Sequence, residues 1–393
     1  MVVTAVVRLE GALSWGDLLV LFDERVLVHE RMRARVVARS RWLPHLPFWR
    51  ESSVTARDQL TRVTLASAGA SDADLAALVS DLMNRPLDMS QPPWRAWLVE
   101  GGRDTVLVFR IHHVLADGLA LLELLGALCD EGAIRAASSP SRTPPPSQPR
   151  PSVRARATAA ARLLTAPLDA PSSLTGALSG RKRIAWSKPF ELARVRDAAR
   201  RAGAHVNAVF LAALSGAVAP RTAPSAPPLH VLVPVALPRE SGALRNHYVS
   251  LFVPLPVASA SPMDRVRAAQ AAVDDARARA GIPLGEVLVA GAALLGPLGE
   301  RLAVRVLSRK ASLVASNVAG PSSPLHLGGH LVTDVMFAAP APGAIALSLN
   351  LMTYRDALRV TVATDTAIVP DPAVVVHRVE EELDRVVDAL GDR

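Results

Sequence analysis

The chain has 393 residues, half of them hydrophobic, so it is long enough for two folded units and too apolar for a disordered protein. A single cysteine, Cys129, excludes a disulfide framework and any cysteine-rich metal site. The net charge of +8 is local, because residues 150–201 alone hold twelve Arg or Lys and three Asp or Glu. That segment is either a solvated surface or an attractor of phosphate groups, anionic membranes or nucleic acid. An aromatic content of 4% argues against nucleic acid, whose binding usually uses aromatic residues between basic ones.

Alternating apolar residues and turn signals predict both strands and helices in the first part of the chain. In chain order they are a strand at Val2–Leu9, a helix near Ser14–Glu24, a loop over Val36–Arg50, a helix from Ser71 to about Met83, a hairpin of Trp97–Glu100 with Thr105–His113, and an apolar helix at Leu119–Cys129. Ser71 followed by Asp74 three residues later is a capping pair.

The clearest break in composition is Ser138–Ser152, with six prolines and five serines in fifteen residues. Such a stretch holds neither a helix nor a central strand. We therefore predict two folded halves, residues 1–137 and 189–393, joined by a Pro-rich, basic crossover at 138–188.

The second half mixes helices with short strands, which predicts an α/β (α+β) architecture in two parts. The expected elements are helices at Glu191–Ala202, Val206–Val218 and Met263–Ala280, two buried helices within Leu284–Leu307, a closing helix at Pro372–Leu390, strands at Leu229–Leu237 and Tyr248–Val257, and four strands of one sheet at Ser312–Val318, Gly329–Phe337, Ala344–Met352 and Leu358–Asp365.

No secretory signal is visible, and the longest strongly apolar run, Val287–Gly299, is shorter than a membrane span. We expect a cytoplasmic protein that is free to touch a membrane or lipid-inclusion surface.

The residues expected to take part in catalysis lie in the stretch Arg110 to Gly118. Alternation along the strand places His113 on the face of the apolar residues and His112 on the face of Arg110. An imidazole among apolar neighbours stays neutral near pH 7, so it can take a proton from a nucleophile. The alternative is that one histidine is packed and the other exposed, with no chemistry.

Asp117 has two structural interpretations that compete with a chemical one. It can cap the following helix, or it can form an ion pair that fixes the turn around His113. Gly118 would permit close packing at this turn. A metal site is not expected, because adjacent strand residues point to opposite faces.

His112-His113-x-x-x-Asp117-Gly118 resembles the HHxxxDG signature of CoA-dependent acyltransferases and condensation domains. Other segments narrow the resemblance to the bacterial wax ester synthase/diacylglycerol acyltransferase family. They are Pro86-Leu87-Asp88 with Pro92-Pro93-Trp94, Asn207 in its helix, Asn246 with the Val253–Val257 strand, Ser316-Asn317-Val318-Ala319-Gly320-Pro321, and Tyr354, Asp365 and Pro370-Asp371 in order.

The resemblance implies two chloramphenicol-acetyltransferase-like halves with mixed sheets and a tunnel between them. It implies acyl-CoA as co-substrate, a hydroxyl acceptor such as a long-chain alcohol or diacylglycerol, no permanently bound cofactor, and His113 as general base. Asp117 would then be structural and held by an arginine, and Asn207 and Asn317 would lie near the substrates. Asn317 has a second interpretation, in which it only shapes the turn at Gly320-Pro321.

Two other functions stay open on the sequence. One is a condensation-type enzyme that takes acyl groups from a carrier protein. The other is a noncatalytic lipid-binding relative, which is suggested by Ala208 where the family carries an Asp after Asn207.

Overall fold

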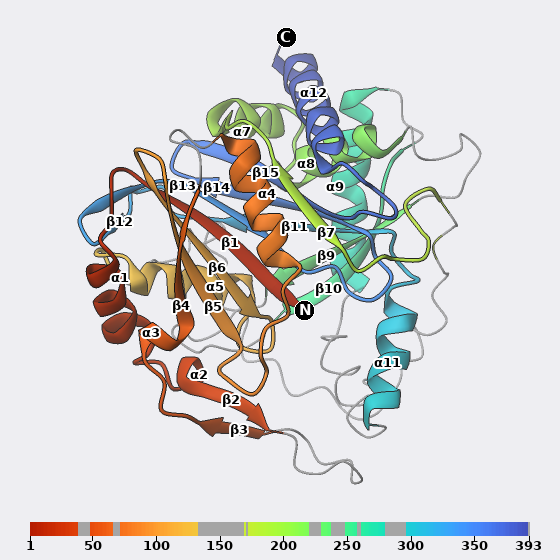
Figure 1. Ribbon diagram of the computed structural model, residues 1–393. Coiled ribbons are helices and arrows are strands. Elements are labelled where there is room, and N and C mark those ends of the chain that lie inside the picture. Colours follow the sequence, from red (N-terminus) through yellow and green to blue (C-terminus); the bar gives the residue numbers. More distant parts are fainter. Residues whose placement is uncertain are drawn as a thin grey trace, which may run out of the picture.

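The computed structural model describes residues 1–37, 48–65, 71–132, 169, 172–219, 229–236, 248–257, 261–279 and 296–391. Within these residues the chain forms two large mixed sheets with helices around them (Figure 1). A small antiparallel pair, β2 (Ala34–Val37) with β3 (Phe48–Glu51), lies beside the first sheet in a segment that was predicted as loop.

The first sheet is built mainly from the N-terminal half. Its strand order is β12 (His326–Leu327), β13 (His330–Ala338), β1 (Val2–Leu9), β6 (Thr105–His112), β5 (Trp94–Glu100) and β4 (Leu60–Thr64). The predicted β5–β6 hairpin is confirmed. Its turn depends on Gly101, whose φ is +124° and where a Cβ would lie 2.5 Å from the Leu65 carbonyl oxygen.

β13 comes from the C-terminal half and pairs antiparallel with β1. The prediction that Gly329–Phe337 belongs to one sheet with the later strands is therefore wrong. Without β13, β1 would leave an unpaired edge beside the start of the chain, and this pairing covers it.

The second sheet belongs to the C-terminal half. Its strand order is β10 (Tyr248–Pro254), β9 (His230–Ala236), β11 (Leu313–Ala319), β14 (Leu347–Tyr354), β15 (Ala357–Asp365) and β7 (Lys182–Trp186), with the short β8 (Phe190–Glu191) also on β15. β11 runs parallel to both of its neighbours. Because β7 lies in this sheet, the last part of the predicted crossover 138–188 already belongs to the C-terminal half.

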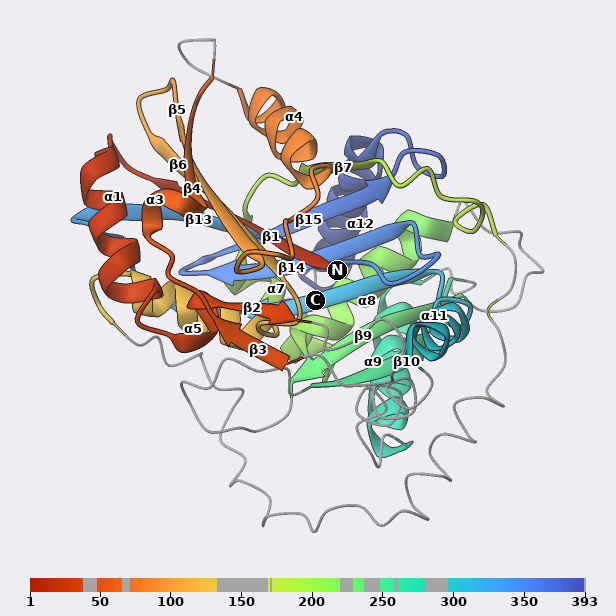
Figure 2. The same ribbon diagram turned by 60° about the horizontal axis from the view of Figure 1, so that its bottom comes forward.

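The helices surround the two sheets (Figure 2). They are α1 (Trp15–Leu21), the π-helical turn η1 (Phe22–Val26), α2 (Glu30–Arg33), α3 (Ala56–Gln59), α4 (Asp72–Met83), α5 (Gly118–Leu128), α7 (Leu192–Arg201), α8 (Val206–Val218), α9 (Pro262–Arg279), α11 (Gly296–Leu307) and α12 (Pro372–Gly391). α7, α8, α9 and α12 share one large hydrophobic core with the second sheet. The capping pair at the start of α4 is confirmed, since Ser71 Oγ accepts from the Asp74 amide and Asp74 accepts from the Ser71 amide.

α11 corrects the expectation of two buried helices within Leu284–Leu307. Residues 280–295 lie outside the described residues, and α11 is a surface helix. Leu298 and Leu302 are 76% and 58% exposed.

α4 joins the two halves. Leu75, Val79 and Leu82 on its buried face share a core with Ile184 and Trp186 of β7. The end of this helix is fixed to the same strand by a reciprocal pair of hydrogen bonds, in which Asn84 accepts from the Lys182 amide at 2.7 Å and donates to its carbonyl at 2.9 Å. The two sheets are thus held together by apolar and polar contacts, and the space between them has fixed walls.

Candidate active site

β6 brings the histidine pair to the boundary between the halves. The strand ends at His112, and His113 begins the turn that leads into α5. The His113 amide donates to the Met1 carbonyl oxygen at 2.9 Å, so the backbone pairing with β1 continues as far as this residue. The predicted division of faces is confirmed. Phe109 and Ile111 line an apolar space beneath α5, whereas Arg110 lines a different cavity.

The ring of His112 is held by contacts with backbone nitrogen atoms. Its Nδ1 accepts a hydrogen bond from the Val114 amide at 3.2 Å, and its Nε2 lies 3.1 Å from the Met1 amino nitrogen. Burial, helped by the neighbouring positive charge of that amino group and by His113, lowers the pKa of His112 from 6.5 to about 4. The ring is therefore neutral at neutral pH, and both of its nitrogens are in contact with backbone groups.

His113 lines a cavity of about 100 Å³ between the two sheets. Its half-buried ring meets the ring of Tyr248, from β10 of the second sheet, edge to face, with 5.5 Å between centroids and 63° between planes. The other residues that line the cavity are Val3, Asp117, Gly118, Leu119, Pro234, Ala236, Ser316, Asn317, Val318, Phe337 and Ala339. The side chain with the predicted base function thus faces a cavity to which both halves contribute.

Asp117 is the N-cap of α5. Its side chain is buried, and Oδ1 accepts from the Ala120 amide at 3.0 Å. This confirms the capping interpretation. Burial, followed by the nearby negative charge of Asp117, raises the pKa of Tyr248, so the carboxylate also acts electrostatically on the cavity.

Gly118 lies where α5 begins and lines the cavity beside His113. A Cβ at this position would meet Val318 Cγ2 at 3.4 Å, the distance of an ordinary van der Waals contact. The start of α5 therefore packs against β11, as the expectation of close packing at Gly118 stated.

The two predicted substrate-binding asparagines are placed differently. Asn317, at the end of β11, lines the cavity of His113. Asn207 lies in the first turn of α8 and does not appear among the described residues that line this cavity. Asn246 lies outside the described residues. The function of both described asparagines stays a prediction.

Sequence reasoning singled out Ser316, Asn317 and Val318 of β11, and it missed Tyr248 and the residues of β9 and β13 that complete the cavity. Tyr248 comes at the start of a strand that was predicted correctly, but only the pairing of the sheets shows that this end meets His113. Proximity to Asn246 in the sequence was the available signal, because that asparagine belongs to the segments that carried the family resemblance.

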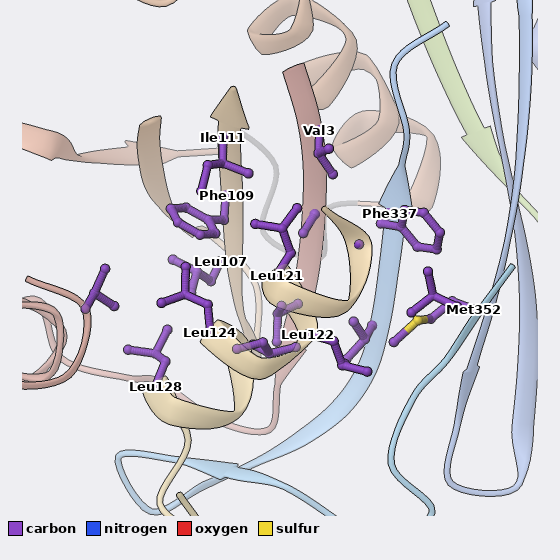
Figure 3. Close-up of a pocket in the computed structure, with 17 residues that line it drawn as sticks. Val3, Leu107, Phe109, Ile111, Leu121, Leu122, Leu124, Leu128, Phe337 and Met352 are labelled. Atoms are coloured by element: carbon purple, nitrogen blue, oxygen red, sulfur yellow. The ribbon is translucent and has the colours of Figure 1, made fainter. Parts of the chain in front are cut away.

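A second, apolar space adjoins this cavity. Figure 3 shows it between α5 and the face of the first sheet, and all of its lining residues are apolar or glycine. Four residues line both spaces, namely Val3, Gly118, Val318 and Phe337. An apolar space therefore lies next to the cavity of His113.

A histidine from an HHxxxDG sequence lies between two mixed α/β halves. This arrangement places the protein in the class of acyl-transferring enzymes. Family models match two parts of the chain, the wax ester synthase/diacylglycerol acyltransferase catalytic domain over residues 1–164 and the WS/DGAT C-terminal domain over residues 244–386. The chain belongs to the wax ester synthase/diacylglycerol acyltransferase family, as the sequence resemblance predicted, and it is an O-acyltransferase.

Individual relatives agree with this assignment. A putative diacylglycerol O-acyltransferase from Mycobacterium bovis and a probable one from Mycobacterium tuberculosis are each 30% identical over 364 residues, 83% of this chain and 78% of theirs. The wax ester synthase/diacylglycerol acyltransferase from Marinobacter aquaeolei VT8 superposes with a TM-score of 0.70 at 20% identity, over 100% of this chain and 95% of that one. The starter condensation domain of rhizomide synthetase, solved with C8-CoA and Leu-SNAC, has a TM-score of 0.65 at 15% identity over 100% and 89%. The condensation domain thus shares the fold, and the predicted fold class is confirmed.

Proposed function

We propose that this O-acyltransferase moves the acyl group of an acyl-CoA to the hydroxyl of a long-chain alcohol or a diacylglycerol, with His113 as general base. One observation carries the proposal. His113 faces a cavity at the boundary of the halves, and an apolar space that shares four lining residues with this cavity adjoins it. The names of the mycobacterial relatives support a lipid hydroxyl as acceptor.

The reaction needs one group that holds a proton temporarily. Neutral His113 takes the proton of the acceptor hydroxyl while its oxygen attacks the carbonyl carbon of the thioester. The carbon–sulfur bond then breaks, the imidazolium returns the proton to the departing thiolate, and the products are an ester and free CoA. Exclusion of water during the reaction would favour this sequence, because water in the cavity would compete as acceptor.

Attack on the thioester places negative charge on the carbonyl oxygen. Asn317 is a polar side chain of the cavity whose amide can donate to such an oxygen, and α5 directs the positive end of its dipole toward the same space. We assign Asn317 to oxyanion stabilisation on this basis.

Asp117 and Gly118 support the site without taking part in proton transfer. By capping α5, Asp117 fixes the turn in which His113 lies. Gly118 lets the start of α5 pack against Val318 at the wall of the cavity. They are positioning residues, and His112 belongs with them because its ring contacts the backbone of the same turn.

Helix α11 has a face that suits contact with a lipid surface. Leu298, Arg301, Leu302 and Arg305 follow the spacing of one helix face, and all four are exposed. Exposed leucines beside arginines match an anionic lipid surface. No helix in the described parts of the chain is long and apolar enough to cross a membrane. We propose peripheral contact through α11, which would bring the enzyme to its lipid acceptors.

Release of free thiol tests the catalytic proposal. The purified protein with an acyl-CoA and a long-chain alcohol or diacylglycerol is expected to release CoA, and His113→Ala should abolish this release. His112→Ala removes a contact of the same turn and should reduce release less than His113→Ala, whereas loss of release in His112→Ala alone would assign the base to His112. Turnover that persists in His113→Ala would contradict the general base, and turnover only with an acylated carrier protein would favour the condensation-type alternative.

A further inference from the structure

A cavity of about 330 Å³ lies between the two halves, on the face of β1 that is opposite to the cavity of His113. Val2 and Thr4 of β1 line it, whereas Val3, which points to the other face of the strand, lines the cavity of His113. Its remaining walls are the end of α4 with the turn that follows and, from the second half, parts of β7, β14 and β15 (Figure 1). No step of the proposed reaction takes place in it.

The charged side chains that line this cavity in the described parts of the chain are all cationic. They are Arg85, Arg110 and Lys182. Lys182 has a counterion, since its Nζ lies 3.4 Å from Oδ2 of Asp365. Within the described residues neither arginine has a carboxylate at ion-pair distance, so the cavity holds an excess of positive charge.

Arg110 is the most buried of these cations, with an exposed fraction of 3%. Its Nη1 donates to the Arg85 carbonyl oxygen at 2.7 Å, and its Nη2 donates to the Met83 carbonyl oxygen at 3.2 Å. These bonds give the side chain a structural function at the end of α4. They use only part of the donor capacity of a guanidinium, and Nε has no hydrogen-bond partner among the described residues.

The burial of this guanidinium is electrostatically unfavourable. Burial, followed by the positive charge of Arg85, lowers the pKa of Arg110 from 12.5 to about 10. The group is still protonated at neutral pH, so the positive charge stays in the cavity. Because a buried charge is costly unless it is paired, an anion bound beside Arg110 would offset this cost.

We propose that this cavity binds a small molecule that carries a phosphate group. A guanidinium can donate to two oxygens of one phosphate, and a second cation such as Arg85 matches its second negative charge. Most of the other lining residues are small or apolar, among them Pro86, Ala339 and Pro340, and they suit an organic group attached to the phosphate. The proposal goes beyond the proposed function and does not depend on it.

Short contacts connect this site with His113. Arg110 lies on β6, three residues before His113. Met1 lines the cavity of Arg110, and its carbonyl oxygen accepts from the His113 amide at 2.9 Å. Ala339 lines both cavities. The phosphate can therefore belong to the nucleotide end of an acyl-CoA or to a separate compound, and both sources offer the same group to Arg110.

Calorimetric titration of the purified protein with inorganic phosphate and with adenosine 3′,5′-bisphosphate tests the site without turnover. At constant ionic strength we expect saturable binding at one site. Arg110→Gln should weaken it by about tenfold or more, because a charge-assisted hydrogen bond is lost. Arg85→Gln changes an exposed residue, so the fold is kept, and should weaken it by about threefold or more. Arg57→Gln, at an exposed position of α3, is the matched control and should bind as the wild type does.

The outcomes decide the proposal and identify the source of the phosphate. Lack of binding of both probes, or equal binding by the wild type, Arg110→Gln and Arg85→Gln, overturns the site. In a thiol-release assay, inhibition by the bisphosphate that is competitive with acyl-CoA and weaker in Arg85→Gln supports the site and assigns it to the donor. Binding that depends on the arginines without such competition supports a separate phosphate compound. A protein that binds phosphate at this site but releases no thiol keeps the site and refutes the proposed function.

Discussion

The carboxylate of Asp117 has a purely structural explanation, and its substitution tests whether that explanation is sufficient. Asp117→Ala removes the acceptor of the Ala120 amide at the start of α5. Loss of an N-cap costs about 0.5–2 kcal/mol, and loss of a negative charge at this end of the helix dipole adds about 0.3–1 kcal/mol. Asp117→Asn keeps a capping oxygen and removes the negative charge.

We therefore expect the free energy of unfolding to decrease in the order wild type, Asp117→Asn, Asp117→Ala, with a total loss of about 1–3 kcal/mol. Denaturant unfolding measures this loss directly, because in a chain of this length one kcal/mol shifts Tm by only about 1 °C. Ser71→Ala removes the cap of α4, away from the cavity, and is the matched control. It should reduce stability by about 1 kcal/mol and leave kcat/KM unchanged.

Activity decides between the two interpretations of Asp117. If the residue only fixes the turn, Asp117→Asn should keep kcat/KM within about threefold of the wild type, an effect well below 1.4 kcal/mol in the barrier. A loss of about a hundredfold or more, with stability preserved, would show that the negative charge takes part in the chemistry. The structural explanation would then be refuted.

Three further predictions concern titration and surface contact. Because the charge of Asp117 contributes to the raised pKa of Tyr248, Asp117→Asn should lower that pKa, and NMR of tyrosine-labelled protein would detect it. His112 has a pKa of about 4 in the folded protein against 6.5 ordinarily, so its contribution to stability is complete above pH 6.5 and is lost as the pH falls toward 4. His112→Gln should flatten this part of the stability curve, and an unchanged curve would contradict the buried, neutral ring. Replacing Leu298 and Leu302 together with Asn should reduce co-sedimentation with anionic vesicles while activity on a water-soluble alcohol persists, and equal binding by the variant would remove α11 as the contact surface.

Local patterns predicted the parts of the fold that local forces determine. The cap of α4, the β5–β6 hairpin and the start of α5 each depend on residues a few positions apart, and each is found where the sequence indicated. The faces of β6 followed from alternation alone. His113 could therefore be singled out before any tertiary contact was known.

Pairing between distant strands could not be predicted in this way. β13 resembles the later strands in composition, and its position beside β1 depends on the competition of all strands for partners. Tyr248 and Val318 reach His113 only because the second sheet faces the first. Their neighbours Asn246 and Asn317 belong to segments that carried the family resemblance, but the resemblance does not show that Tyr248 and Val318 meet His113 in one cavity.

The spacing of the HHxxxDG sequence follows from the structure that it forms. The first histidine ends the strand and the second begins the turn, so only the second faces the cavity. The three residues that follow bring the chain to the helix start, where Asp117 must accept the Ala120 amide. The next residue, Gly118, lines the cavity of His113 beside Val318 of β11. A single turn thereby places the base at the cavity and fixes the start of the helix, so a longer or shorter spacing would separate the imidazole from the cap that fixes its turn.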